Sequence, residues 1–210
     1  MLNLIFDLDG CLIDSAEVQK AAYYGSYKEV VGDDNCPPFS EYLKYTGDSI
    51  VNVIKKLGLP VEMADVYRRI SVESVDKIIV NQECMELIRA FREKGSKISI
   101  CTGKDHYRAE EILMYFKIDN LFDALVSSDD VSEPKPSPVP ILMAVEKMHV
   151  DKGTCVVIGD GLYDLLSAKN AGVKSILTLW YGDGDVERIA DGVVETVSEL
   201  EKILIEWEKQ

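Results

Sequence analysis

The stretch "IFDLDGCLIDS", residues 5–15, places Asp7, Asp9 and Asp14 directly after an apolar run that is typical of a buried strand. Asp7 and Asp9 are two residues apart, so their side chains point to the same side of an extended chain. Gly10 then allows the sharp turn that must follow. Because neighbouring carboxylates repel one another, this concentration of acidic groups at the end of a strand predicts a bound cation.

More short apolar runs, each bounded by turn residues, recur later in the chain. They are "KISICTG" (97–103), "ALVSSDD" (124–130), "CVVIGDG" (155–161) and "SILTLW" (175–180). Segments with a helical spacing of apolar residues separate the later runs. This alternation predicts the α/β class, a doubly wound, Rossmann-like parallel sheet with helices on both faces.

One interval breaks the alternation of strands and helices. Between the first strand and the next, residues 15–80 show only helical patterns, separated by "GDDNCPPF" and "GLP", where Gly and Pro end helices. We therefore expect an α/β core formed by residues 1–14 and 81–210, with a helical cap subdomain, residues 15–80, inserted after the first strand.

Polar side chains stand where the predicted strands end, which is where a parallel sheet binds its ligands. The strand ends carry Asp7 and Asp9, Thr102 and Gly103, and Asp160, and the third strand continues into the polar loop that contains Lys135. Asp160 and Asp164 are four residues apart, so they share one face of the helix that follows. Oxygen ligands without His or Cys favour a hard cation, and Mg²⁺ is the expected cofactor because it can share its coordination shell with a phosphate.

Two further segments supply groups that suit a phosphoryl ligand. Lys135 lies between Pro134 and Pro136, which stiffen the loop and fix the position of the ammonium. A fixed positive charge beside Asp7 would keep that carboxylate ionised and would neutralise a phosphoryl oxygen. Thr102, at the start of the predicted helix, offers a hydroxyl and free backbone N–H groups. Each motif alone fits a turn, a loop or a helix cap, but their order at strand ends favours one phosphate site.

The segments "DLDGCLIDS", "TGK", "EPKPSP" and "GDGLYDLLSAKNAG" resemble, in order and context, the four signature motifs of the haloacid dehalogenase-like superfamily. The resemblance spans nearly the whole chain and is to the phosphoglycolate-phosphatase-like branch, whose members carry a helical cap after the first motif. It implies that Asp7 is a nucleophile that forms an aspartyl-phosphate. It also implies that Asp9 protonates the leaving alcohol and then activates water.

The same resemblance implies the remaining parts of the site. Phosphoryl oxygens would be bound at Thr102, with Gly103 beside it, and at Lys135. The Mg²⁺ ligands would be Asp7, Asp160 and the backbone carbonyl of Asp9, with Asp164 supporting the metal. We expect a structural role for Asp14, as a cap of the next helix or as a hinge.

The function expected from this resemblance is a Mg²⁺-dependent phosphatase that hydrolyses a small phosphorylated metabolite, a sugar phosphate or a phosphoglycolate-like monoester. Two alternatives stay open. A phosphomutase of the β-phosphoglucomutase type is disfavoured because such mutases commonly carry a His where this chain has Gln19. A catalytically silent phosphate-binding regulatory module is disfavoured by the presence of Asp9.

The cap is the part expected to select the substrate. "KYTGD", residues 44–48, occupies the position of the loop that faces the active site in related caps, so Lys44, Tyr45 and Thr46 are the specificity candidates. Tyrosines at helical spacing elsewhere in the cap are more typical of a packed interface. The cap also resembles those of phosphatases of 3-amino-5-hydroxybenzoate biosynthesis, which would imply a substrate from secondary metabolism.

Composition limits the partners. The net charge of -14 provides no basic surface for nucleic acid or an anionic membrane, so we expect a small metabolite as partner and a monomer or small homo-oligomer. The five cysteines include no CxxC pair and suit reduced thiols in the cytoplasm. The N-terminal region has neither a basic segment nor a long apolar run, so we expect no signal peptide and no membrane span.

Overall fold

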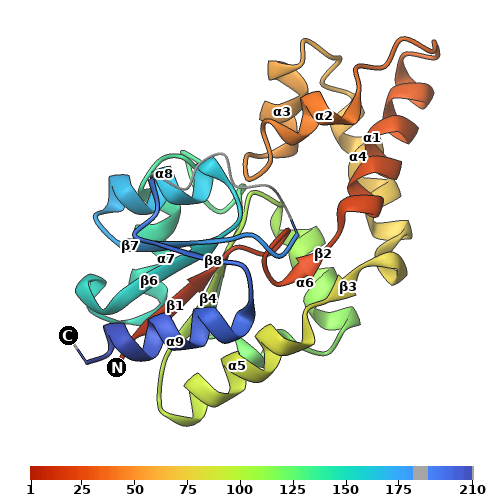
Figure 1. Ribbon diagram of the computed structural model, residues 1–210. Coiled ribbons are helices and arrows are strands. Elements are labelled where there is room, and N and C mark those ends of the chain that lie inside the picture. The colour runs from red at the N-terminus through yellow and green to blue at the C-terminus, as the bar shows by residue number, and fades with distance from the viewer. Residues whose placement is uncertain (182–188, 210) are drawn as a thin grey trace.

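The computed structural model describes residues 1–181 and 189–209, and within them six strands form one parallel sheet in the order β5-β4-β1-β6-β7-β8 (Figure 1). The strands are β1 (Asn3–Phe6), β4 (Ile98–Cys101), β5 (Ala124–Val126), β6 (Cys155–Gly159), β7 (Lys174–Thr178) and β8 (Gly192–Val194). All five pairings in this sheet are parallel. The predicted α/β class is confirmed. Strands β4, β5 and β6 and all but the first residue of β7 lie within the predicted apolar runs, and β1 lies in the apolar run before Asp7.

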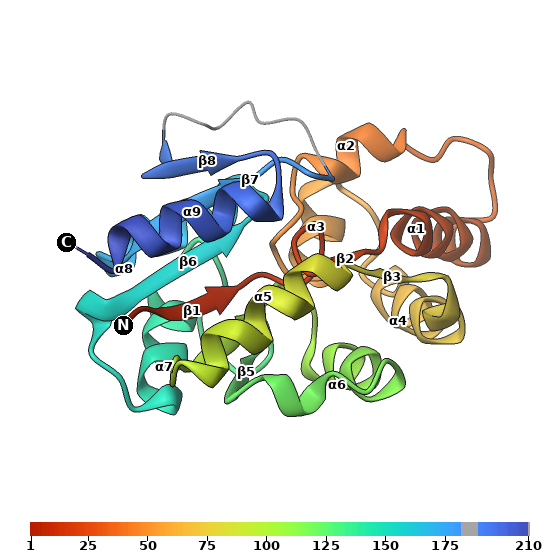
Figure 2. The same cartoon turned by 60° about the horizontal axis from the view of Figure 1, so that its bottom comes forward.

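Both faces of the sheet are covered, as β1 illustrates. Every residue of β1 is buried, with Leu4 and Phe6 in one apolar cluster and Ile5 in another. Helices α5 (Gln82–Glu93), α6 (His106–Tyr115) and α9 (Val197–Trp207) contribute to the first cluster, and α7 (Val139–Met148) and α8 (Leu162–Ala171) to the second. Figure 2 shows α5 and α9 in front of the sheet. Strand β1 therefore lies in the interior of a doubly wound sheet, with helices on both faces.

The interval after β1 is helical, as its sequence predicts, and it has an apolar cluster of its own. Its elements are α1 (Ala16–Val30), α2 (Phe39–Leu43), α3 (Ile50–Lys56), α4 (Met63–Glu73) and the 3-10 turn η1 (Val75–Lys77). The cluster is formed by Ala22, Tyr23, Tyr27, Tyr42, Ile50, Val53, Ile54, Met63, Ala64 and Tyr67. These tyrosines are buried, so they pack in the way that their helical spacing predicts.

A short antiparallel ribbon joins the helical part to the sheet. It pairs β2 (Ile13–Asp14) with β3 (Ile79–Val80), so it lies at the two ends of the predicted insert. The division into a core of residues 1–14 and 81–210 and a cap of residues 15–80 stays a prediction, and its core range includes residues 182–188, which lie outside the described residues. We refer below to residues 15–80 as the cap.

The strand order reverses beside β1. The chain passes from β1 to β4 and β5 on one side, and then to β6, β7 and β8 on the other. The remaining 3-10 turns, η2 (Asp119–Leu121) and η3 (Lys152–Thr154), precede β5 and β6. The carboxyl ends of β1, β4 and β6 therefore meet at the point where such sheets bind ligands. Among the helices that the structure describes, none combines the length and apolarity needed to cross a membrane.

Candidate functional site

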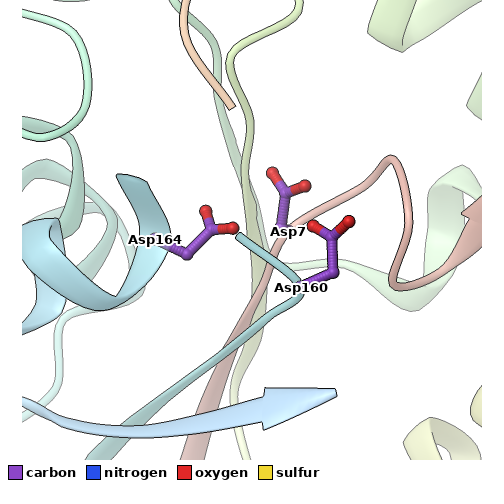
Figure 3. Close-up of side chains that lie close together, drawn as sticks. All are labelled: Asp7, Asp160 and Asp164. Carbon is purple, nitrogen blue, oxygen red and sulfur yellow. The ribbon is translucent and has the colours of Figure 1, made fainter. Parts of the chain in front are cut away.

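Three carboxylates converge at the carboxyl ends of β1 and β6. Asp7 extends β1, because its N–H donates to the carbonyl of Ile158 at 2.8 Å, while Asp160 follows β6 and Asp164 lies in the first turn of α8. One carboxylate oxygen from each of the three lies within 4.8 Å of the others (Figure 3). The three side chains that were predicted for the metal site therefore lie together.

Glycines make the approach of these carboxylates possible. Gly10 has a φ of +73°, and a Cβ added there would lie 1.9 Å from Asp160 Oδ2. A Cβ at Gly159 would lie 2.6 Å from Asp164 Cβ. The N–H of Gly161 donates to Asp164 Oδ2 at 3.2 Å, which anchors that carboxylate at the start of α8. At Gly10 and Gly159 there is therefore room for a hydrogen atom but not for a side chain.

Lys135 connects two of the three carboxylates. Its ammonium donates to Asp7 Oδ1 at 2.9 Å, to the carbonyl of Cys101 at 2.6 Å and to Asp164 Oδ1. Lys135 is 3 % exposed. Because an ammonium has three hydrogens, each already has a protein acceptor, so Lys135 can bind a phosphoryl oxygen only by sharing or exchanging one of them.

The electrostatics of this group indicate that a cation belongs to it. Burial raises the pKa of Asp7 and Lys135 lowers it, and with the negative charges of Asp164 and Asp9 included the pKa is raised to about 7. Burial, followed by the charges of Asp7 and Asp164, raises the pKa of Asp160 well above its ordinary value. Three carboxylates thus face a single ammonium in a buried site. A divalent cation with oxygen ligands fits this donor set, and Mg²⁺ is such a cation.

Asp9 lies apart from the three carboxylates. Asp9 Oδ1 accepts a hydrogen bond from Ser15 Oγ, and Asp9 Oδ2 lies 3.0 Å from the ammonium of Lys104. Burial raises the pKa of Asp9, but Lys104 and Ser15 outweigh burial and the pKa is lowered overall. Asp9 is therefore ionised, and an ionised carboxylate can accept a proton as a base. The role of acid predicted for it requires a proton that this arrangement does not retain.

Thr102 follows β4, but no helix begins at it. Helix α6 begins at His106, and the carboxylate of Asp105 caps it by accepting a hydrogen bond from the N–H of Arg108 at 3.3 Å. The prediction of a helix start at Thr102 is therefore wrong, because Asp105 takes the capping position. The Thr102 hydroxyl accepts from the N–H of Lys104 at 3.2 Å and keeps its own hydrogen for another acceptor.

A cavity of about 470 Å³ lies above these residues, between the sheet and the cap. Its lining includes Asp7, Asp9, Thr102, Gly103 and Asp160 from the core and Tyr42, Thr46 and Tyr67 from the cap. Lys135 and Asp164 lie beneath this surface, in contact with Asp7. Asp7, Asp9, Thr102 and Gly103 therefore border one space that is large enough for a small molecule, while Lys135 lies behind Asp7.

The three specificity candidates are placed differently from one another. Thr46 lines the cavity, whereas Lys44 and Tyr45 lie outside its lining. The ammonium of Lys44 pairs with Glu41 at 2.7 Å on the surface, and the ring of Tyr45 lies 5.4 Å from the ammonium of Lys56 within the cap. A role for Lys44 or Tyr45 in substrate selection stays a prediction that requires a movement of this loop.

Sequence reasoning missed two cations in the cavity wall. Lys104 and Arg108 both line the cavity, and both are buried. Burial and the charge of Arg108 lower the pKa of Lys104, although Asp9 opposes this. The available signal was "TGKDHYR", in which two basic residues four positions apart directly follow the end of a strand. Thr102 and Gly103 lie at the strand terminus, whereas Lys104 and Arg108 lie beyond it, so the rule about strand ends does not identify them.

The cap lies in contact with the core on both sides of the cavity. The ammonium of Lys56, in α3, donates to Asp48 Oδ2 at 2.7 Å and to the hydroxyl of Tyr163, in α8, at 2.8 Å. Arg68, in α4, pairs with Asp105 at 3.1 Å. Between these contacts the backbone of Gly103 adjoins the carbonyl of Gly47, since a Cβ added at Gly103 would lie 2.3 Å from that oxygen. The cap therefore covers part of the cavity.

This close approach leads to a prediction about Gly103. We expect Gly103→Ala to displace residues 44–48, because the added Cβ meets backbone rather than a flexible side chain. Exchange of the hydrogen-bonded amides of Tyr45, Thr46 and Asp48 should become at least about tenfold faster in a mass-spectrometric measurement.

Gly161→Ala is the matched control, because a Cβ at Gly161 would have its nearest neighbour at 3.5 Å, an ordinary contact. It should leave amide exchange in residues 44–48 unchanged. Unchanged amide exchange in residues 44–48 of Gly103→Ala would contradict this prediction and show that the core, rather than the cap, moves to accommodate the added Cβ.

Comparison with known proteins shows which family and which relatives this chain is similar to. The sequence profile described as haloacid dehalogenase-like hydrolase matches residues 4–178. A protein named pyrophosphatase PpaX from Bacillus mycoides is 28% identical over 208 residues, which cover 96% of this chain and 96% of that protein. A phosphoglycolate phosphatase from Aquifex aeolicus is 28% identical over 210 residues, which cover 97% of each chain.

Solved structures show the same architecture. A hydrolase from Pseudomonas syringae superposes with a TM-score of 0.86 at 27% identity, over 98% of this chain and 99% of that chain. CbbY from Rhodobacter sphaeroides, in complex with phosphate, gives a TM-score of 0.83 at 23% identity, over 95% of this chain and 96% of that chain. At that identity the second likeness concerns the fold alone.

Proposed function

We propose that this chain, which belongs to the haloacid dehalogenase-like hydrolase family, is a Mg²⁺-dependent phosphatase that hydrolyses a small phosphorylated metabolite through an aspartyl-phosphate. One observation carries the proposal: Asp7 lies at the floor of the cavity, between the carboxylates of Asp160 and Asp164 and the ammonium of Lys135. The names of the PpaX and phosphoglycolate phosphatase relatives support phosphoryl chemistry.

Asp7, Asp160 and Asp164 are the side chains that would hold Mg²⁺, which when bound supplies positive charge for the phosphoryl oxygens. Lys135 holds Asp7 Oδ1 and so fixes the orientation of the carboxylate towards the cavity. An oxygen of Asp7 attacks phosphorus, the bond from phosphorus to the leaving oxygen breaks, and that oxygen takes up a proton. The product of this step is an acyl phosphate, the aspartyl-phosphate of Asp7.

Asp9 acts in the second step. Its carboxylate, ionised because of Lys104 and Ser15, takes a proton from the water that attacks the phosphorus of the aspartyl-phosphate. The bond between phosphorus and Asp7 then breaks, which releases inorganic phosphate and restores the nucleophile. In the first step Asp9 donates the proton to the leaving alcohol, and this requires that its contact with Lys104 opens when substrate binds.

Two features favour hydrolysis over the alternatives. Gln19 Nε2 donates to Ser15 Oγ at 2.8 Å, so an amide, which has no acid-base function, stands where a mutase would place a His. The presence of Asp9 in the cavity, with both of its oxygens engaged, argues against a silent binding module. The cavity of about 470 Å³ and the net charge of -14 suit a small metabolite in the cytoplasm.

The function is tested by incubating the purified full chain and Mg²⁺ with a panel of phosphorylated metabolites and measuring phosphate release. We expect release from a subset of small monoesters. The proposal fails if none of them, and no activated aryl phosphate, is hydrolysed.

The metal requirement leads to a separate prediction. Chelation by EDTA should abolish phosphate release, and added Mg²⁺ should restore it. Asp160→Asn should weaken Mg²⁺ binding, measured by calorimetry, on the order of 10²-fold, because it removes one of three clustered carboxylates. Asp34→Asn, the same change on the exposed surface, should bind Mg²⁺ like the wild type. Equal affinity in Asp160→Asn and the wild type would remove Asp160 from the metal site.

A further inference from the structure

The cavity has a second charged end, which lies away from the three clustered carboxylates. Arg108 lines it and is 4 % exposed. Arg108 Nε donates to Asp105 Oδ2 at 2.7 Å, and the ring of Tyr67 lies 5.2 Å from the guanidinium carbon. Nε therefore makes the hydrogen bond to Asp105, and the guanidinium also interacts with the hydroxyl of Tyr67. Because the two terminal nitrogens of a guanidinium carry four N–H groups, donors remain for a molecule in the cavity.

The cations at this end of the cavity share their carboxylates. Asp105 pairs with Arg108 at 2.7 Å and with Arg68 at 3.1 Å, and Arg68 also pairs with the exposed Asp65 at 2.9 Å. The ammonium of Lys104 pairs with Asp9 at 3.0 Å. Within residues 1–181 and 189–209, the buried Arg108 therefore has one ion-pair partner, Asp105, and shares it with Arg68. An anion bound in the cavity would give Arg108 a second partner.

Two tyrosines add hydrogen-bond donors beside Arg108. The hydroxyls of Tyr42 and Tyr67 lie 2.7 Å apart, and both residues are buried and line the cavity. Only one of the two hydroxyls donates in this contact, so the other keeps its hydrogen for a further acceptor. Burial raises the pKa of both groups, which keeps them in the protonated form that donates.

We propose that Arg108, together with the hydroxyls of Tyr42 and Tyr67, binds a second anionic group, a carboxylate or a phosphoryl group, on the leaving part of the substrate. A guanidinium presents parallel N–H donors that match the oxygens of either group. Lys104 lines the same cavity and pairs with Asp9, the residue proposed to protonate the leaving oxygen. The inference rests on the proposed function and names its substrate class: phosphate esters with two anionic ends.

The test compares matched pairs of esters. In one pair, 2-phosphoglycolate carries a carboxylate and 2-hydroxyethyl phosphate lacks it. In the other, 1,3-propanediol bisphosphate carries a second phosphoryl group and 3-hydroxypropyl phosphate lacks it. We expect the wild type to prefer the doubly anionic member of at least one pair by at least about tenfold in kcat/KM. The pair that shows the larger preference identifies the group that Arg108 binds.

Arg108→Met should remove this preference, by lowering kcat/KM for the doubly anionic ester on the order of 10²-fold. The singly anionic partner and 4-nitrophenyl phosphate should change by less than about threefold, because neither reaches Arg108 with an anion. Tyr67→Phe should cause a smaller loss of about three- to tenfold with the same selectivity. Arg108→Lys, which keeps the charge but not the fork of donors, should fall between Arg108→Met and the wild type.

Arg68→Met is the matched control, because it removes the other guanidinium from Asp105 and does not line the cavity. It should lower the turnover of both members of a pair equally. The inference is overturned if Arg108→Met keeps the wild-type preference, or if Arg68→Met loses it to the same extent. If Arg108→Met does not fold, as judged by circular dichroism, Tyr67→Phe and Arg108→Lys decide in the same way.

Failure of the proposed function is recognised separately. A wild-type protein that hydrolyses none of these esters, 4-nitrophenyl phosphate included, would refute the phosphatase proposal. Calorimetric titration with 2-phosphoglycolate and 1,3-propanediol bisphosphate would then still decide the role of Arg108. We expect a weakening of Kd on the order of 10²-fold in Arg108→Met for one of them, and equal affinity for both would overturn the subsite.

Discussion

Asp7→Asn should lower Mg²⁺-dependent phosphate release from 4-nitrophenyl phosphate by about 10⁴-fold or more. The amide can still accept a hydrogen bond from Lys135, so the fold of the site should survive, but it cannot attack phosphorus as a carboxylate does. In the part of the chain that the structure describes, Asp7 is also the carboxylate that Lys135 orients at the cavity surface. The measurement is the initial rate of phosphate release at saturating Mg²⁺, with mass spectrometry to detect the phosphoenzyme.

Asp14→Asn provides the matched control for Asp7→Asn. Asp14 also lines the cavity, but its carboxylate accepts a hydrogen bond from the N–H of Ala16 at 3.0 Å, which an amide oxygen can replace. We expect a change of less than about threefold, in keeping with the structural role predicted for this residue. Activity in Asp7→Asn that stays within tenfold of the wild type would rule out the aspartyl-phosphate.

The strands and their ends were predictable because both rest on local patterns and one topological rule. A run such as residues 2–8 is apolar on both faces, which only a central strand requires, and β1 is indeed buried throughout. The end of a strand in a parallel sheet has a fixed place in the fold. Asp7 and Asp160 could therefore be assigned to one site even though 152 residues separate them in the sequence.

Strand β8 shows where such patterns fail. It contains three residues, of which only Val194 is buried, and it pairs on one side only, at the edge of the sheet. An edge strand of this length has no apolar run to reveal it. The start of α6 was misplaced for a related reason, since the choice between Thr102 and Asp105 as the helix cap depends on which side chain reaches the N–H of Arg108.

The cavity wall could not be predicted because it depends on how the cap lies on the core. Whether a cap residue faces the cavity is decided by contacts such as that of Lys56 with Tyr163, which join parts of the chain 107 residues apart. Lys44 and Thr46 are close neighbours in the sequence, yet Lys44 pairs with Glu41 on the surface and Thr46 lines the cavity. Periodicity within one helix carries no information about such contacts.

Asp9→Asn should change the time course of the reaction, because it affects both phosphoryl transfer and hydrolysis of the aspartyl-phosphate. With a poor alkoxide leaving group, phosphoryl transfer should slow on the order of 10²-fold or more, because the leaving oxygen is not protonated. An aryl leaving group needs little protonation, so transfer from 4-nitrophenyl phosphate should slow less. Attack of water on the aspartyl-phosphate, however, would lack its base. Rapid-mixing measurements should therefore show a burst of 4-nitrophenol followed by slow turnover, with phosphoenzyme accumulating.

Ser15→Ala is the matched control for Asp9→Asn, because it changes a neighbour of Asp9 and keeps its carboxylate. It removes the hydrogen bond to Asp9 Oδ1 but leaves the carboxylate and its contact with Lys104 at 3.0 Å, so turnover should fall by less than about tenfold and no burst should appear. In Asp9→Asn the affinity for Mg²⁺ should be retained, because the Asp9 side chain lies apart from the cluster of Asp7, Asp160 and Asp164. A loss of Mg²⁺ affinity without a burst would instead make the Asp9 side chain a metal ligand and refute its role in proton transfer.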